Sequence, residues 1–206
     1  MSWTEGDAAP VNPDIGIAFS GWAEVYQALS SGPLAESLHG RKYLSVGGSN
    51  VNGVMNAATF KAMEENLDYV KDAGFIGICF DIESTQDENH YIPAMEAAFA
   101  AVKAKDLKVM VTTSHSAPIK SHAAARVVDA WIKSDNIDIL SPQLYSTGKE
   151  KQVQTVASNG VSWDHWKGAK ATIVPSIVDG SHWAKTLQFF QNQGIPVGGY
   201  LQWAEC

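Results

Sequence analysis

The sequence has few cysteines and few basic residues. Its two cysteines, Cys79 and Cys206, are too few for a disulfide framework. We do not expect them to pair, because Cys79 lies inside a predicted strand and Cys206 is the last residue. The 15 Lys and Arg residues are outnumbered by 22 acidic residues, which gives a formal charge of −7. This balance argues against a nucleic-acid partner, whose phosphates require a basic patch.

Long apolar runs are also lacking. No stretch of about 18 apolar residues is present, so no membrane span is predicted. The chain does not begin with a basic segment followed by an apolar core, so no secretory signal is predicted, and a processed form of a secreted protein is an alternative. The 206 residues, of which 45% are hydrophobic and 18% charged, have an ordinary globular composition. We therefore assign residues 1–206 to a single domain.

The most informative stretch is residues 75–83, Phe-Ile-Gly-Ile-Cys-Phe-Asp-Ile-Glu. Its apolar residues and the absence of proline predict a buried strand. Because residues i and i+2 share a face of a strand, Cys79, Asp81 and Glu83 point one way and Phe80 points the other. Two neighbouring carboxylates raise each other's pKa, which allows one to stay protonated near neutral pH. Spacing alone leaves the alternative that these acids cap a helix or lie in a solvated loop.

Strands and helices alternate along the chain. A short predicted strand covers residues 15–19, and further strands start near positions 42, 75, 108, 137, 171 and 198, at intervals of 27 to 34 residues. This spacing is typical of repeated βαβ units, in either a doubly wound sheet or a (β/α) barrel. Polar groups fall late in six strands, as the active sites of barrels do, which favours an α/β fold of the TIM-barrel type. These groups are Ser45, Asp81, Glu83, Ser114, His115, Gln143, Tyr145, Asp179, Gln202 and Trp203.

Helical patterns separate the strands. The clearest contains Phe60 and Val70 and is followed by Gly74, a C-terminal stop. A weaker pattern covers residues 149–158. Ser181 is placed to cap the N-terminus of a helix. Other predicted helices cover residues 22–38, with a break near Gly32 and Pro33, residues 91–104, residues 123–133, and the segment from Ser181 to Gly194.

Residues 75–83 resemble the signature of glycoside hydrolase family 18, the chitinase family. That signature reads apolar, Asp/Asn, Gly, apolar, Asp/Asn, apolar, Asp/Asn, any residue, Glu. Seven of its nine positions match, and the departures are Ile76 and Cys79. Three more segments resemble family motifs in the same order. They are Tyr43-Leu44-Ser45-Val46-Gly47-Gly48, similar to the Ser-x-Gly-Gly strand, Gln143-Leu144-Tyr145, similar to the Gln-x-Tyr of plant-type members, and Gly198-Gly199-Tyr200-Leu201-Gln202-Trp203, similar to the closing strand.

The resemblance implies substrate-assisted, retaining hydrolysis of β-1,4-linked N-acetylglucosamine, in which the substrate's own acetamido oxygen attacks the anomeric carbon. It implies that Glu83 is the general acid and base and that Asp81 orients the acetamido group and stabilises the positive intermediate. It further implies that Tyr145 hydrogen-bonds this group. Trp203 would stack under the sugar, and Gln143 would contact the acetamido group or Asp81. Neither a metal nor a nucleotide cofactor is implied.

Two departures from the family pattern leave other functions open. Cys79 replaces the innermost acid, so Asp81 lacks a like-charge neighbour there and its pKa should be less elevated. Only seven strands are recognisable, so we expect an incomplete barrel that lacks a first strand and a last helix. Its open edges would invite a homodimer. The alternatives are a weak or inactive lectin that binds N-acetylglucosamine oligomers and a scaffold or assembly protein. Glu83 favours the enzyme, because binding alone needs no general acid.

Other conspicuous residues are assigned to structure. Ser45, Gly47 and Gly48 are expected to form a tight turn and to pack, and not to contact substrate. Trp163 and Trp166 flank a histidine, and surface packing is a better interpretation of them than a sugar cleft.

Overall fold

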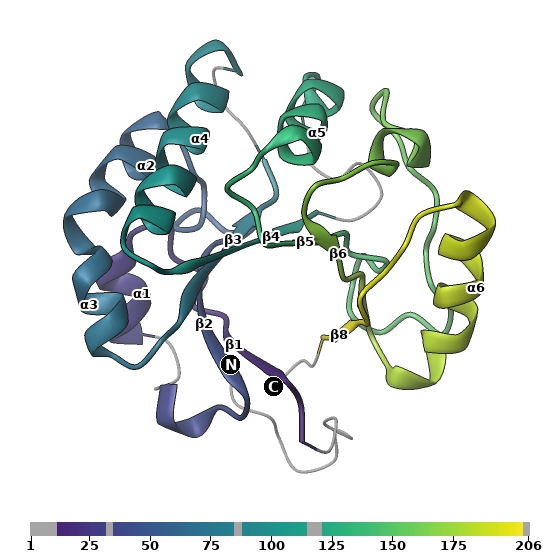
Figure 1. Cartoon of the computed structure of the whole chain (residues 1–206), viewed down its shortest axis with the longest axis horizontal. Helices are drawn as coiled ribbons and strands as arrows, with labels where there is room; N and C mark the ends of the chain where they lie inside the picture. Colours follow the sequence, from purple (N-terminus) through teal and green to yellow (C-terminus); the bar gives the residue numbers. More distant parts are fainter. Residues whose placement is uncertain (1–11, 32–34, 85–87, 115–120, 204–206) are drawn as a thin grey trace.

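The computed structural model describes residues 12–31, 35–84, 88–114 and 121–203, and the predicted polar residue His115 lies outside these ranges. A curved layer of parallel strands encloses an interior, and helices cover its outer side (Figure 1). Six strands form one sheet in the order β1 to β6, and β7 and β8 form a parallel pair. The strands are β1 (Ile15–Ala18), β2 (Arg41–Gly47), β3 (Gly77–Ile82), β4 (Lys108–Thr113), β5 (Ile139–Ser141), β6 (Thr172–Ile173), β7 (Ser176–Ile177) and β8 (Leu201–Gln202).

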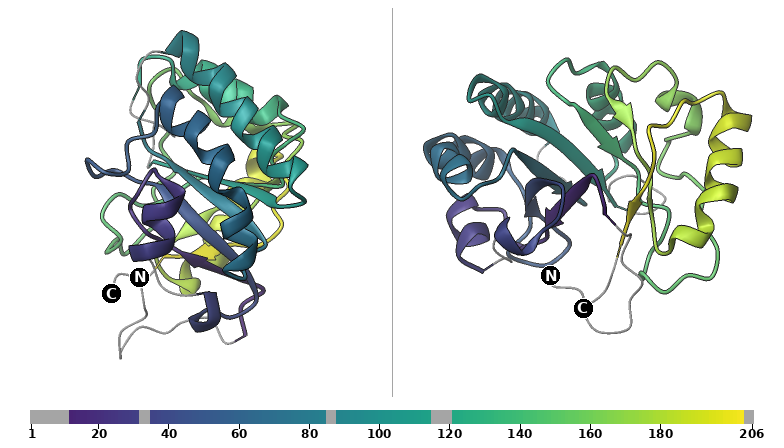
Figure 2. Two further views of the ribbon diagram at one scale, coloured as in Figure 1. Left: turned by 90° about the vertical axis from the view of Figure 1, so that its left-hand side faces the viewer. Right: turned by 60° about the horizontal axis from the view of Figure 1, so that its bottom comes forward.

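Helical segments connect most of these strands and lie on the convex side of the layer (Figures 1 and 2). Their alternation with strands is that of consecutive βαβ units. The α-helices are α1 (Val25–Ser31), α2 (Ala57–Met63), α3 (Leu67–Asp72), α4 (Glu88–Ala104), α5 (Ala124–Lys133) and α6 (Trp183–Gln193), and the 3₁₀-helices are η1 (Ala35–Ser37), η2 (Glu64–Asn66), η3 (Trp163–Trp166) and η4 (Gly180–His182). No helix in the described part of the chain is long and apolar enough to cross a membrane.

The predicted strand at residues 171–178 is split into β6 and β7. Pro175 stands between them and has no N–H to give to a neighbouring strand. The sheet nevertheless continues past the break, because Ser176 bridges to Gln143 and its carbonyl accepts the N–H of Leu144 at 2.9 Å. The seven predicted strand positions are therefore confirmed, and the chain forms an incomplete (β/α) barrel whose terminal strands are β1 and β8. The predicted homodimer stays a prediction.

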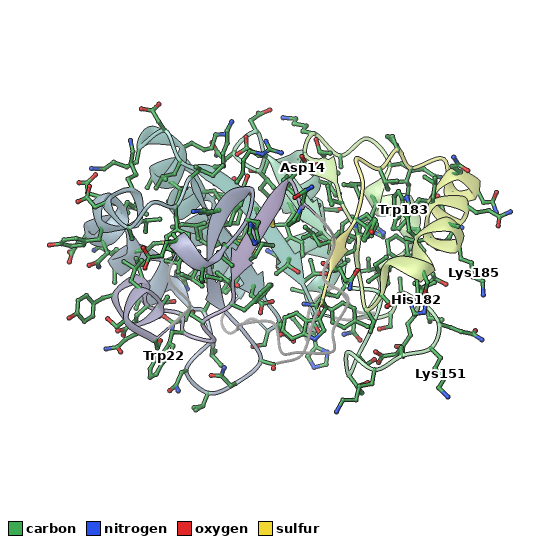
Figure 3. The ribbon with its side chains drawn as sticks, turned by 90° about the horizontal axis from the view of Figure 1, so that it is seen from below. Asp14, Trp22, Lys151, His182, Trp183 and Lys185 are labelled. Atoms are coloured by element: carbon green, nitrogen blue, oxygen red, sulfur yellow. The ribbon has the colours of Figure 1, made fainter. Side chains whose placement is uncertain are left out.

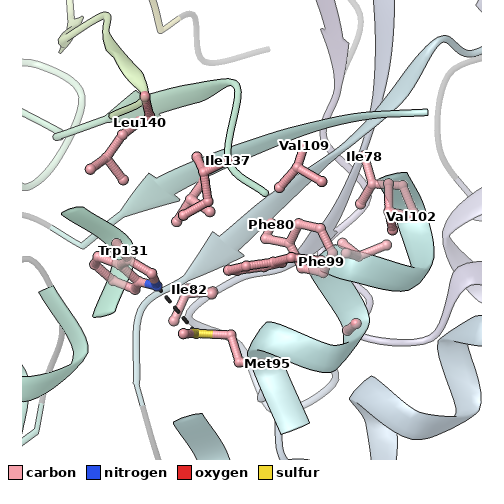
Figure 4. Close-up of a cluster of buried hydrophobic side chains, with 14 of the residues drawn as sticks. Ile78, Phe80, Ile82, Met95, Phe99, Val102, Val109, Trp131, Ile137 and Leu140 are labelled. Atoms are coloured by element: carbon pink, nitrogen blue, oxygen red, sulfur yellow. Dashed lines mark hydrogen bonds between the residues drawn. The ribbon is translucent and has the colours of Figure 1, made fainter. Parts of the chain in front are cut away.

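The outward face of the strands carries the main hydrophobic core. All six residues of β3 are buried, as in a parallel strand covered on both faces. Phe80 packs edge-on against Phe99 of α4, with ring centroids 4.7 Å apart (Figure 4). On the next helix, the indole N–H of Trp131 points to the sulfur of Met95 at 3.2 Å. The α4 and α5 helices are thus fixed against β3 and β4 by large, fully buried side chains.

The inward face of the strands is different. Tyr43, Cys79 and Met110 form a small buried cluster inside the barrel, packed against residues of β1 and β8 that include Ile17 and Leu201. The predicted alternation along β3 is therefore confirmed for its buried part. Cys79 faces the interior, whereas Phe80 belongs to the outer core.

Two helix predictions are wrong and two predicted stops are confirmed. Residues 149–158 form no helix, because Val156 is 73% exposed and no apolar stripe exists to bury. Ser181 does not cap α6: its N–H is accepted by the Asp179 side chain at 2.8 Å, and η4 intervenes before α6. The predicted helix ends at Gly74 and Gly194 are confirmed, because these residues adopt left-handed φ angles of +85° and +71°. Trp163 and Trp166 do pack, with rings 5.6 Å apart, but the predicted surface position is wrong for Trp166, which is fully buried in the main hydrophobic core.

Candidate active site

The ends of β2 and β3 meet at one rim of the barrel. Gly47 has a φ of +105°, and a Cβ at this position would collide with the carbonyl oxygen of Asp81. The N–H of Gly48 donates to that same carbonyl at 2.9 Å. Only glycine permits this close approach of two backbones. The structural role predicted for Gly47 and Gly48 is confirmed, and it fixes the backbone that carries Asp81.

The carboxyl group of Asp81 is held in a buried environment. The residue is 7% exposed, and its Oδ1 has no hydrogen-bond partner within the described residues. Burial raises the pKa of Asp81 well above its ordinary value, and the neighbouring Glu83 raises it further. The pKa of Cys79 is also raised, first by burial and then by Asp81, so the thiol is neutral. A thiol neighbour therefore does not prevent an elevated pKa at Asp81, because desolvation is the larger effect.

Glu83 follows the last residue of β3 and is half-buried. Burial raises its pKa, while a hydrogen bond from the backbone N–H of Ser49 lowers it. The net direction is upward, so Glu83 holds a proton to a higher pH than an exposed glutamic acid does. Two acids of raised pKa, two residues apart, are able to share a proton near the rim of the barrel.

Two aromatic side chains from distant segments accompany these acids. Tyr145 follows β5 and is 6% exposed. Burial raises the pKa of its phenol, as do the charges of Asp81 and Glu83, so the phenol lies within electrostatic reach of both carboxylates and stays a hydrogen-bond donor. Its ring stacks on that of Trp203, at 6.1 Å between centroids and 23° between planes. The edge of Phe19 meets the same indole at 5.1 Å.

A cavity of about 1050 Å³ opens between β1 and β8 and reaches this aromatic pair. Asp14, which precedes β1, and Trp183 of α6 both line this cavity, and Figure 3 shows how these two residues lie. Tyr145 and Trp203 line the cavity, whereas Asp81 and Glu83 are not among its lining residues. The phenol and the indole thus form part of the wall of this cavity, and the two acids do not.

The remaining predicted residue lies apart from this group. Gln143 lines a small hollow of about 10 Å³ together with Gln154 and Trp163, and it does not line the large cavity. Its contact with a substrate stays a prediction. Ser45, which pairs in register with Cys79, is fully buried, and its hydroxyl has no hydrogen-bond partner among the residues that the structure describes.

Three residues that the sequence did not indicate contribute to the site. Phe19 follows β1, and its place at the end of an apolar run was a usable signal. The backbone N–H of Ser49 donates a hydrogen bond to Glu83, and a backbone contact of this kind cannot be predicted from the type of residue. Glu150 accepts hydrogen bonds from the turn after Tyr145. The segment Thr147-Gly-Lys-Glu150 matches the S/T-x-x-E pattern in which such side-chain to backbone bonds occur.

No protein-family model and no curated protein matches the sequence. Among solved structures, the chain is similar to a fungal endo-β-N-acetylglucosaminidase from glycosyl hydrolase family 18, with 15% identity over 80% of this chain and 64% of that one and a TM-score of 0.49. It is also similar to the homocysteine methyltransferase MmuM from Escherichia coli, with 13% identity over 93% and 75% of the two chains and a TM-score of 0.48. A chitinase from Chromobacterium violaceum gives 20% identity over 66% and 49%, with a TM-score of 0.44.

These neighbours have different activities and low similarity. Glycosidases and a methyltransferase align about equally well, so the similarity does not choose among functions. The aligned part covers less than two thirds of either glycosidase. The fold assignment rests on the strand order and the parallel pairing of this chain.

Proposed function

We propose that this protein is a chitinase-like glycosidase that hydrolyses β-1,4-linked N-acetylglucosamine with Glu83 as general acid and base. The observation that carries the proposal is the stacking of Tyr145, which follows β5, on Trp203, which follows β8, at the same end of the parallel strands as Asp81 and Glu83. Sequence motifs point to these residues independently. An acid pair, a phenol and an indole are the groups that substrate-assisted cleavage of an N-acetylated sugar requires.

The first step would use the protonated form of Glu83. Its raised pKa keeps the proton available, and the proton passes to the glycosidic oxygen as the bond to the anomeric carbon breaks. The acetamido oxygen of the same sugar attacks that carbon, which yields a positively charged oxazolinium ring. For this step the proton that the two acids share would sit on Glu83, so that Asp81, as the carboxylate, would stabilise the positive charge and accept a hydrogen bond from the acetamido N–H. The hydroxyl of Tyr145 would donate to the acetamido group.

The second step would reverse the proton transfer. Glu83, now a carboxylate, removes a proton from a water molecule as the water oxygen attacks the anomeric carbon. The oxazolinium ring opens, the acetamido group is restored, and Glu83 regains its proton. Two inversions at one carbon give net retention of configuration. Trp203 would hold the sugar ring from below throughout, since its flat face offers apolar contact area.

The experiment is hydrolysis of a fluorogenic chitobioside and chitotrioside by the wild type, by Glu83→Gln and by a matched control, Glu65→Gln, at an exposed position of η2. We expect turnover by the wild type and the control, and loss of roughly a thousandfold in Glu83→Gln, as for removal of a general acid. Oligomer binding without wild-type turnover would instead support the lectin. Equal turnover by Glu83→Gln, or neither binding nor turnover by the wild type, would contradict the proposal.

A further inference from the structure

We propose that Glu150 is a positioning residue whose carboxylate fixes the turn Ser146–Glu150, and that this turn keeps Trp203 in place under the substrate. The kinetic part of this inference rests on the proposed function, whereas the structural part does not. Glu150 would not touch the sugar. It would act through Gly148 and Tyr145.

The turn is organised around one carboxylate oxygen. Oε1 of Glu150 accepts the backbone N–H of Ser146 at 2.8 Å and that of Thr147 at 2.7 Å. The Thr147 hydroxyl donates to the same oxygen at 3.0 Å. Hydrogen bonds to an ionised acceptor are shorter and stronger than neutral ones. Desolvation raises the pKa of Glu150, but these hydrogen bonds outweigh it and lower the pKa to about 2, so the acceptor stays charged at working pH.

The turn lies directly against the indole. Gly148 has a φ of +78°, and a Cβ at this position would come within 2.7 Å of Nε1 and 2.8 Å of Cδ1 of Trp203. The backbone of the turn therefore covers one edge of the indole, while Phe19 meets it edge-on and Tyr145 stacks on it. Lys151, next to Glu150, lies at the same end of the molecule as Trp22 and at the opposite end from Asp14 (Figure 3).

The same turn is tied to the strand that leads to Tyr145. The N–H of Gln154 donates to the carbonyl of Leu144 at 2.9 Å, and the Ser146 hydroxyl donates to Oε1 of Gln154 at 2.8 Å. The side-chain amide of Gln154 reaches Oε1 of Glu150 at 3.4 Å. Tyr145 thus lies between two residues whose bonds depend on this network. The charge of Glu150 also contributes to the raised pKa of the Tyr145 phenol, after burial and the charges of the β3 acids and Cys79.

Removal of the carboxylate would leave the N–H groups of Ser146 and Thr147 without their acceptor. Loss of this acceptor should loosen the backbone of the turn and change the global free energy of unfolding little, because the turn is exposed. Gly148 would then move away from the indole, and Trp203 would lose this contact. Substrate binding should weaken more than the chemical step, since Glu83 and Asp81 sit on β3 and beyond its end.

The test compares Glu150→Ala, Glu150→Gln and the control Glu65→Gln. The first readout needs no substrate: the indole N–H resonance of Trp203 in a two-dimensional NMR spectrum, assigned with Trp203→Phe. The second readout is kcat and KM on the fluorogenic chitotrioside. We expect Glu150→Ala to shift the Trp203 resonance and to raise KM about tenfold with kcat reduced less than threefold. Glu150→Gln keeps an acceptor oxygen without the charge, so we expect about a threefold rise in KM.

The two readouts separate two failures. An unmoved Trp203 resonance in Glu150→Ala would overturn the inference, as would equal KM values for wild type and variant. A wild type without turnover would overturn the proposed function, and the resonance would still decide the role of Glu150. If Glu150→Ala does not fold, the Trp203 resonance is measured in Glu150→Gln and in Gly148→Ala. In Gly148→Ala the added Cβ must displace Trp203 and shift its resonance. A resonance unchanged in both of these variants would contradict the inference.

Discussion

The two halves of the barrel are built differently. Strands β1 to β4 contain 4, 7, 6 and 6 residues, whereas β5 to β8 contain 3, 2, 2 and 2. The first half supplies Asp81 and Glu83 from the end of a fully buried strand. The second half supplies Tyr145 and Trp203 from segments that extend beyond very short strands. The acids are therefore positioned by a continuous hydrogen-bonded ladder, and the aromatic pair is positioned by turns and ring contacts.

Because the two halves are built differently, substitutions in them should affect different properties of the protein. Ladder positions such as those around Phe80 contribute to the core that every helix of the first half packs against. The aromatic pair is held by a few contacts, with the ring of Phe19, with the turn at Gly148 and through the hydrogen bond from the backbone N–H of Trp203 to the carbonyl of Ile177. Substitutions in the first half should therefore unfold the protein or stop the chemistry, and those around Trp203 should weaken binding and leave the fold intact.

The largest effect on stability is expected for Phe80→Ala. This side chain is fully buried between Phe60 and Phe99, so its truncation should lower the free energy of unfolding by about 3–5 kcal/mol. Phe189→Ala is the matched change in the second half, where the ring is only half-buried, and should cost less than about 2 kcal/mol. Urea unfolding monitored by circular dichroism measures both values. Equal costs would remove the contrast between the halves.

Trp203→Ala should change binding and little else. Loss of the stacking surface is expected to raise KM for the chitotrioside about tenfold, equivalent to about 1.4 kcal/mol. The free energy of unfolding should fall by less than about 2 kcal/mol, as for Phe189→Ala, because Trp203 is also half-buried. Steady-state kinetics and unfolding of the same preparation test this. A large loss of stability with unchanged KM would place Trp203 in the core and not in the pocket.

Cys79→Asp should shift the pH dependence of the reaction. A second carboxylate inside the barrel disfavours ionisation of Asp81, which raises its pKa and moves the acidic limb of the rate profile upward by about one pH unit. Cys79→Ser is the neutral control and should keep the wild-type profile. If Cys79→Asp leaves both the rate and the profile unchanged, the interpretation of position 79 is wrong.

Asp81 should also make stability depend on pH. Because the pKa of Asp81 is raised in the folded state, its contribution to stability is complete below the unfolded value of about 3.9 and is lost as pH rises through the folded value. Asp81→Asn should remove this pH dependence. Between pH 4 and 7, the free energy of unfolding of the variant should therefore rise relative to that of the wild type, by less than about 1.4 kcal/mol per pH unit. Urea unfolding at several pH values measures the difference. A constant difference across this range would contradict burial of an ionisable Asp81.

Local patterns in the sequence predicted much of the fold. Alternation within residues 75–83 placed Cys79 inside and Phe80 outside, because each side of a buried strand has a distinct packing partner. The helix at residues 149–158 was predicted wrongly, because the segment has no apolar stripe to bury, as the exposed Val156 shows. The contacts of Trp203 with Phe19 and Gly148 join segments far apart in the chain, and no local pattern reports them. The strand predicted at residues 171–178 took no account of Pro175, which lies between β6 and β7, and only the pairing shows that the sheet continues past it.

The most direct measurement is a crystal structure of Glu83→Gln bound to chitotriose. We predict that one sugar ring lies on the indole of Trp203 and that its acetamido group lies between Asp81 and the hydroxyl of Tyr145. A trisaccharide bound elsewhere on the barrel, or an acetamido group turned away from Asp81, would contradict substrate-assisted hydrolysis at this rim.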